Sequence, residues 1–136
     1  MSELQRILVI RRDNIGDLVC TTPLIAALRA RYPKAWIGAL VNSYNAPVLE
    51  GNPDLDALYS YEKLKHRGGQ GAILGTLVGA VVDRFRLIRS LRAQKLDCVV
   101  IATTTYVSRT VNLAAMFHPK AIAGFVDGKC PDARIR

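Results

Sequence analysis

The stretch ILVIRRDNIGD, residues 7–17, decides the fold. Its first four residues are continuously apolar, which is typical of a strand buried on both faces of a sheet. The rest is mostly charged or polar, contains a glycine and is followed by apolar residues at helical spacing. In open α/β sheets, ligands bind outside the carboxyl ends of the strands. We therefore expect Asp13, Gly16 and Asp17 to lie at the mouth of a binding site.

Strand and helix patterns alternate along the remaining chain, as they do in βαβ units with a parallel sheet. The expected strands are residues 5–10, 36–41, 55–61, 98–102 and 121–125. The expected helices after the first are 46–50, 77–94 and 108–117. With right-handed crossovers, this order predicts an α/β fold with a Rossmann-like parallel sheet of about five strands and flanking helices. The domain should span residues 1–126, with 127–136 as a tail or the start of a linker to a second domain.

The start of the first helix is open to two interpretations because Pro23 interrupts its pattern. Either Thr22 caps a helix that begins at Pro23, or one helix begins near Gly16 and bends at the proline. We favour the bent helix.

The 77–94 helix combines an apolar stripe with arginines that should lie on its outer face. The apolar residues at helical spacing are Val81, Phe85, Ile88 and Leu91. The arginines are Arg84, Arg86, Arg89 and Arg92. Two interpretations of these arginines stay open: a peripheral contact with the acidic inner surface of a membrane, or an ordinary charged helix face.

The composition limits what the protein can do. Its 136 residues suit one domain, and the formal charge of +8 favours an anionic partner: a phosphorylated sugar, a nucleotide, an acidic lipid surface or nucleic acid. The sequence shows no helix-turn-helix, RNA-binding aromatic signature or zinc finger, which disfavours nucleic acid, and the first strand lacks the Gly-x-Gly-x-x-Gly pattern of dinucleotide binding. Three widely spaced cysteines and two distant histidines predict neither a disulfide framework nor a metal site. Without a visible signal peptide or membrane-spanning stretch, we expect a cytoplasmic protein.

Beyond these patterns, the chain resembles the N-terminal domain of the ADP-heptose:lipopolysaccharide heptosyltransferases, glycosyltransferase family 9. The matching segments are collinear and cover almost the whole chain: ILVIR (7–11), IGD (15–17), TPLIAAL (22–28), YP (32–33), VLEGNPD (48–54), LDCVV (96–100) and IAGF (122–125). The resemblance implies one half of a GT-B fold, in which two Rossmann-like domains face each other across a cleft. It implies that the N-terminal domain binds an anionic saccharide or lipopolysaccharide acceptor. The donor, ADP-heptose or a related nucleotide sugar, would be bound by the C-terminal domain.

The residues after Phe125 do not supply such a donor domain, so we expect this chain alone to be inactive. The resemblance implies no metal or other cofactor.

The resemblance assigns the catalytic role to Asp17, which corresponds to the family's Gly-Asp pair after the first strand. Its carboxylate is implied to act as general base and to remove the proton of the attacking acceptor hydroxyl. Gly16 beside it would let a sugar approach the backbone closely. From the residues alone, an N-terminal helix cap is the more frequent role of such an aspartate. Asp13 is a rival base or a turn residue.

Other side chains expected near this edge of the sheet are candidates for holding the acceptor. Basic groups suit carboxylates and phosphates, and solvated surface is the alternative for each of them. Threonine hydroxyls after the fourth strand suit sugar hydroxyls, or else cap the next helix. Together with Asp13 and Gly16, the candidates are Arg11, Arg12, Lys63, Lys65, Arg67, Thr103 and Thr104.

A function from another class also stays open. The chain is then a non-catalytic, basic Rossmann-like module that binds a nucleotide or another anionic ligand. Fold alone does not decide between the two functions.

Overall fold

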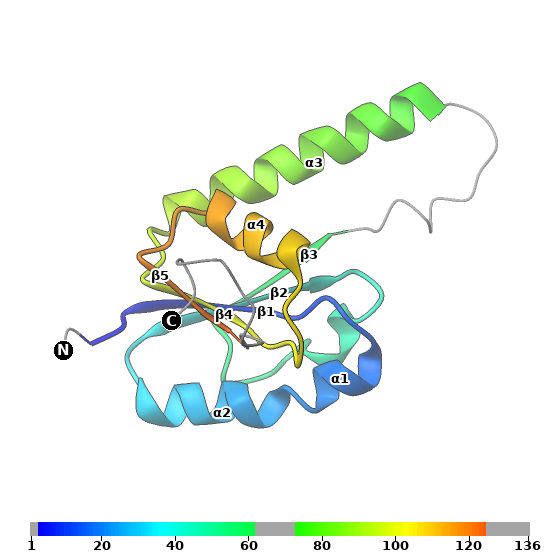
Figure 1. Cartoon of the computed structure of the whole chain (residues 1–136). Helices are drawn as coiled ribbons and strands as arrows, with labels where there is room; N and C mark the ends of the chain where they lie inside the picture. Colours follow the sequence, from blue (N-terminus) through cyan, green and yellow to red (C-terminus); the bar gives the residue numbers. More distant parts are fainter. Residues whose placement is uncertain (1–2, 62–72, 125–136) are drawn as a thin grey trace.

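The computed structural model describes residues 3–61 and 73–124, which form a parallel sheet with helices on both faces (Figure 1). The strands are β1 (Arg6–Ile10), β2 (Trp36–Asn42), β3 (Ala57–Tyr61), β4 (Cys98–Ile101) and β5 (Ala121–Gly124). The helices are α1 (Ile15–Val19), α2 (Thr22–Arg31), the 3-10 turn η1 (Ala46–Val48), α3 (Ile73–Ala93) and α4 (Ser108–Met116). The predicted α/β class is confirmed. Each of the five predicted strands is present, although the third begins two residues later than expected.

The strand order is β3-β2-β1-β4-β5, and all neighbouring strands are parallel. The chain moves outward from β1 through β2 to β3 and then crosses back to β4 on the other side of β1. Open α/β sheets bind ligands at such a reversal, outside the carboxyl ends of the two strands. Ile10 lies opposite Ile101, and Ala102 donates its N–H to the carbonyl of Ile10 at 3.0 Å. The loops after β1 and β4 therefore begin side by side.

The central strand β1 is buried on both faces, as its continuous apolar sequence predicts. Leu8 and Ile10 belong to the cluster that packs against α3 and α4, whereas Ile7 and Val9 pack on the side of α1 and α2. All four side chains are at most 1% exposed. Truncating a side chain of this kind to alanine costs about 2–5 kcal/mol. This strand therefore gives the loop that follows it a rigid starting point.

The helical region after β1 begins at Ile15, which agrees with the bent-helix interpretation, but a break divides it into α1 and α2. Pro23 explains the break, since it has no N–H to donate to the carbonyl of Val19. The hydroxyl of Thr22 donates to that carbonyl at 2.7 Å instead. Thr22 does not cap a helix that begins at Pro23, because the cap position belongs to Thr21.

The apolar stripe predicted for α3 is buried only in the second half of the helix. Ile88 and Leu91 are 8% and 0% exposed, whereas Val81 and Phe85 are 68% and 65% exposed. Figure 1 shows that the first half of α3 extends beyond the sheet and α4, so it has no core to pack against. Of the four residues in the predicted stripe, Ile88 and Leu91 therefore pack in the core, whereas Val81 and Phe85 do not.

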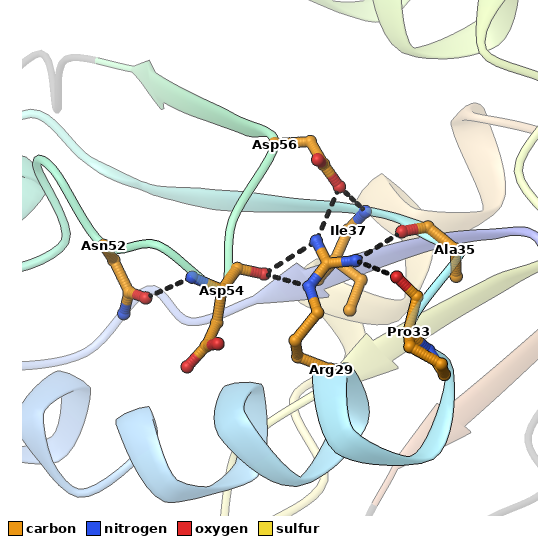
Figure 2. Close-up of polar contacts among 7 residues, drawn as sticks. All are labelled: Arg29, Pro33, Ala35, Ile37, Asn52, Asp54 and Asp56. Atoms are coloured by element: carbon orange, nitrogen blue, oxygen red, sulfur yellow. Dashed lines mark hydrogen bonds and ion pairs between the residues drawn. The ribbon is translucent and has the colours of Figure 1, made fainter.

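Arg29 of α2 ties together the amino ends of β2 and β3 (Figure 2). Its guanidinium donates to Asp56 Oδ2 at 2.7 Å and to the carbonyls of Ala35 and Asp54 at 2.7 and 3.0 Å. Asp56 Oδ2 also accepts the N–H of Ile37 at 2.7 Å. Burial by itself would raise the pKa of Asp56, but the hydrogen bonds from Ile37 and Arg29 outweigh it and hold this pKa below its ordinary value.

A second carboxylate holds the amino ends of β1 and β4. Asp97 accepts the N–H groups of Gln5 and Arg6 at 3.0 Å each, and Lys120 Nζ donates to it at 2.6 Å. The hydrogen bond from Lys120 is the main reason that the pKa of Asp97 lies below its ordinary value. Both carboxylates with a lowered pKa thus lie at the amino edge of the sheet, away from the predicted site.

Candidate functional site

A buried arginine organises the loop that follows β1. Arg11 is 7% exposed, and its guanidinium contacts two carboxylates. Nη2 lies 3.3 Å from Asp17 Oδ1, and Nε lies 3.2 Å from Asp13 Oδ2. The Asp13 contact is an ion pair by distance, although it does not meet hydrogen-bond geometry. One guanidinium therefore holds both acidic side chains predicted for the site.

Both carboxylates remain accessible to a ligand. The side chains of Asp13 and Asp17 are 41% and 47% exposed. Asp17 lies in the first turn of α1, whose cap position belongs to Asn14, so the interpretation of Asp17 as the helix cap is wrong. An ionised carboxylate at a mouth of this kind can accept a proton from a hydroxyl within hydrogen-bond reach.

Two asparagines, one at the end of β2 and one in the loop after it, hold the backbone of the same loop. Nδ2 of the fully buried Asn45 donates to the carbonyl of Asp13 at 2.6 Å, and Nδ2 of Asn42 donates to it at 3.3 Å. Asn42 Oδ1 in turn accepts the N–H of Asn45 at 3.0 Å. The sequence predicts only a polar loop here. The available signal was a pair of amides directly after a buried strand that neighbours β1.

A pocket of about 440 Å³ opens between these two loops. Its lining is Asp13, Asn14, Ile15, Gly16, Asn42, Ser43, Tyr44 and Asn45. Apart from its chain neighbours and the backbone of its own helix, no heavy atom of the described structure lies within 4 Å of the position that a Cβ would occupy on Gly16, so the wall is open there. Asp17 is outside this lining, but Arg11 joins it to Asp13, which is part of it. The amide, hydroxyl and carboxylate groups of the lining suit the hydroxyls of a sugar.

A groove of about 550 Å³ lies beside the pocket, and Ser43 borders both. Arg12 forms part of its wall: Nε donates to the hydroxyl of Tyr61 at 2.6 Å, and the guanidinium lies 5.1 Å from the centre of that ring. From the helices, the lining adds Leu77, Ala80, Val81, Asp83, Arg84, Arg86, Leu87 and Leu113. The groove thus combines apolar side chains with three guanidinium groups.

The threonines after β4 lie at the same edge of the sheet but differ in exposure. Thr103 is 6% exposed, and its hydroxyl donates to the carbonyl of Thr105 at 2.9 Å, which shapes the loop. Thr104 is exposed. The cap position of α4 belongs to Val107, so the alternative that these threonines cap the helix is wrong.

Three of the predicted basic residues lie outside the described residues: Lys63, Lys65 and Arg67. Their role in acceptor binding stays a prediction. Within residues 3–61 and 73–124, no three His, Cys, Asp or Glu side chains are grouped so that they could hold a metal ion. No helix in these residues has the length and apolar character needed to cross a membrane.

Comparison with known proteins finds relatives in sequence and in fold, although no family model matches the chain. The chain is 34% identical over 88 residues to lipopolysaccharide heptosyltransferase 3 of Escherichia coli, which covers 65% of the chain and 23% of that protein. The crystal structure of a family 9 glycosyl transferase from Veillonella parvula matches with a TM-score of 0.70 and 25% identity, over 92% of the chain and 33% of that structure. E. coli heptosyltransferase WaaC with ADP matches in fold, with a TM-score of 0.70 and 15% identity, over 89% of the chain and 36% of that structure.

The sequence and fold comparisons agree with the family resemblance drawn from the sequence motifs. The chain spans about a quarter of the length of the curated relatives it matches. Sequence and fold both relate the chain to one part of the heptosyltransferases of glycosyltransferase family 9, which are GT-B glycosyltransferases.

Proposed function

We propose that the chain is the acceptor-binding part of a glycosyltransferase that transfers heptose to an anionic saccharide of lipopolysaccharide. The observation that carries this proposal is the pair of carboxylates on Arg11, beside a polar pocket that opens between the loops after β1 and β2. The chain matches about a quarter of its curated relatives. The donor, ADP-heptose or a related nucleotide sugar, is then bound by a second domain, and transfer requires both parts.

In this proposal Asp17 is the general base. The acceptor hydroxyl oxygen attacks the anomeric carbon of the donor, the bond from that carbon to the phosphate oxygen breaks, and ADP leaves with the bonding electrons. Asp17 takes the proton of the hydroxyl. A well-placed base of this kind contributes about 100-fold to 10,000-fold to the rate. The step uses neither a metal nor another cofactor.

Arg11 is proposed to act through Asp17 and Asp13 instead of gripping the acceptor directly. Its Nε and Nη2 already face carboxylates at 3.2 and 3.3 Å, and the side chain is buried. Asp13 is the second candidate for the base, because it lines the pocket and Asp17 does not. Gly16 leaves room for the sugar.

The groove beside the pocket is proposed to receive the anionic groups of the acceptor. Arg12 is held in place by Tyr61, and a positioned guanidinium binds a carboxylate or phosphate through two hydrogen bonds. The remaining proposed acceptor contacts are Thr103, Thr104, Lys63, Lys65 and Arg67. The protein would work on the cytoplasmic side of the inner membrane, in peripheral contact with it.

The test joins this chain to the donor domain of a family member and measures ADP release and acceptor glycosylation. Asp17→Asn should reduce transfer about 100-fold or more if Asp17 is the base. Glu50→Gln, which alters an exposed acid away from the pocket, should leave the rate unchanged. Full activity of Asp17→Asn together with loss of activity in Asp13→Asn would transfer the role to Asp13. Full activity of both variants would overturn the mechanism.

The alternative, a nucleotide-binding module without catalysis, is supported by no specific feature of the described residues. A ligand that binds only the folded state raises the melting temperature. Stabilisation of the isolated chain by ADP, which is not expected here, would favour this alternative.

A further inference from the structure

The first half of α3 carries an apolar face that no part of the described structure covers. Leu77, Val78, Val81, Val82 and Phe85 are 46%, 59%, 68%, 41% and 65% exposed, and we name these five residues the α3 patch. With about 3.6 residues per turn, the five side chains fall on one side of the helix, within an arc of about 140°. This half of the helix extends beyond the sheet (Figure 1). The α3 patch is therefore a surface of its own and not the rim of the core.

Arginines border the α3 patch. By helical position, Arg84 lies on one side of its arc and Arg86 on the other, while Arg89 follows it toward the end of the helix. All three are exposed. From residue 73 to 93 the sequence holds four arginines and one acidic residue, Asp83. An apolar helix face flanked by arginines is the form of helix that lies in the plane of an anionic membrane surface.

We propose that the α3 patch docks the protein on a bilayer that contains anionic lipid. The apolar side chains enter the boundary between headgroups and acyl chains, and the arginines meet the lipid phosphates. A second copy of the chain fits this surface less well, because the arginines of the two copies would come together with few carboxylates to match them. The formal charge of +8 on the whole chain adds to the attraction toward an anionic surface.

Docking would bring the candidate acceptor groove to the membrane. Leu77 and Val81 of the α3 patch also line this groove, together with Arg84 and with Arg12. A lipid-anchored acceptor would then meet the groove at the bilayer surface. The docking deepens the peripheral membrane contact of the proposed function and rests on it to that extent, whereas the catalytic role of Asp17 does not enter the docking.

The test measures flotation of the full chain with phosphatidylcholine vesicles prepared with and without phosphatidylglycerol. We expect binding to the anionic vesicles and little binding to the neutral ones. High salt should weaken the binding, because it screens the arginines. A failure to bind anionic vesicles at low salt would overturn the proposal.

Matched variants identify the surface that binds. Val78→Ser combined with Phe85→Ser leaves the groove lining intact and should weaken binding about tenfold or more. Leu24→Ser alters an apolar residue of α2 that is 36% exposed, on the other face of the sheet, and should bind like the parent chain. Arg86→Gln and Arg89→Gln should each weaken binding about fivefold. Equal binding of the patch variant and the Leu24 variant would overturn the proposal.

Two further measurements separate the remaining outcomes. The emission of Phe85→Trp should shift to the blue when anionic vesicles are added, while that of Leu24→Trp should not. If the chain instead forms a dimer that the patch variant breaks, and no vesicle binding occurs, the occupant is a second copy and the proposal fails. Asp17→Asn should bind vesicles like the parent chain, so the docking and the catalytic proposal can fail separately.

Discussion

The side-chain amide of Asn45 donates a 2.6 Å hydrogen bond to the main-chain carbonyl of Asp13, 32 residues away in sequence. It connects the loop after β2 to the loop after β1, so a side chain from one wall of the pocket holds the backbone of the opposite wall. Asn45 is fully buried, and its Oδ1 has no hydrogen-bond partner among the described residues. The site therefore depends on a residue that takes no part in the proposed chemistry.

Asn45→Ala should destabilise the protein by about 1–3 kcal/mol, because it leaves the carbonyl of Asp13 without its shortest hydrogen bond. Urea denaturation measures the change. Asn14→Ala is the matched control: Asn14 is exposed, and no cap hydrogen bond from its side chain is present in the described structure. The control should stay within about 0.5 kcal/mol of the parent chain. Similar losses of stability in the two variants would contradict the role of Asn45 in holding the loop at Asp13.

Arg11→Lys should lower transfer in the joined enzyme about tenfold or more while the protein still folds. A guanidinium is a planar fork that reaches Asp13 and Asp17 at once, and a single ammonium group cannot reproduce that geometry. Steady-state kinetics measure the loss of transfer, and the melting temperature shows whether the variant is still folded. Arg31→Lys, on the exposed end of α2, is the control and should retain full activity. Parent-like kinetics in Arg11→Lys would show that the carboxylates need no such holder.

Gly16→Ala and Gly51→Ala should change stability in opposite directions. Gly51 has a φ of +71°, where an alanine side chain costs about 1–2 kcal/mol. Gly16 lies inside α1 with no described neighbour near its Cβ position, so alanine should stabilise the helix by about 0.5–1 kcal/mol. If a sugar approaches the backbone at Gly16, the same variant raises the KM for the acceptor in the joined enzyme. An unchanged KM would remove Gly16 from the acceptor site.

Stability should fall in acid through Asp56 and Asp97. Both carboxyls have a pKa below the ordinary 3.8, so the unfolded state binds protons first as the pH falls. Their contribution is complete above pH 3.8 and is lost as the pH falls through the lower values of the folded state. Asp56→Asn and Asp97→Asn should reduce the free energy of unfolding at neutral pH and flatten its decline in acid. Urea denaturation across this pH range, with Glu50→Gln as control, measures both effects; an unchanged slope would contradict the assignment.

The strands could be predicted because the residues that determine them are neighbours in the sequence. A strand such as β1, buried on both faces, needs an unbroken apolar run, and Ile7 to Ile10 supply one. The alternation of strands and helices predicts parallel strands, so the placement of Asp13 and Asp17 at the carboxyl edge of the sheet was also predictable. The exposure of Phe85, by contrast, could not be predicted from the sequence. Helical spacing shows that a face is apolar, but it does not show where the sheet beneath it ends.

The contacts within the site could not be predicted because they join distant segments. Asn42 and Asn45 resemble ordinary loop residues until β2 is placed next to β1. Arg11 is a charged residue at the end of a strand, where solvent exposure is the usual expectation, yet it is buried between carboxylates. Such burial depends on the partners Asp13 and Asp17 lying together in space, which only the folded loop establishes.

The hydrogen bonds made by Arg29 and Asp97 lie at the amino edge of the sheet, whereas the pocket lies at its carboxyl edge. Substitutions of residues that touch a substrate therefore leave these hydrogen bonds intact. A scaffold divided in this way can acquire a new acceptor preference over evolutionary time without first being rebuilt, and an engineer can diversify the pocket rim on a foundation that stays constant.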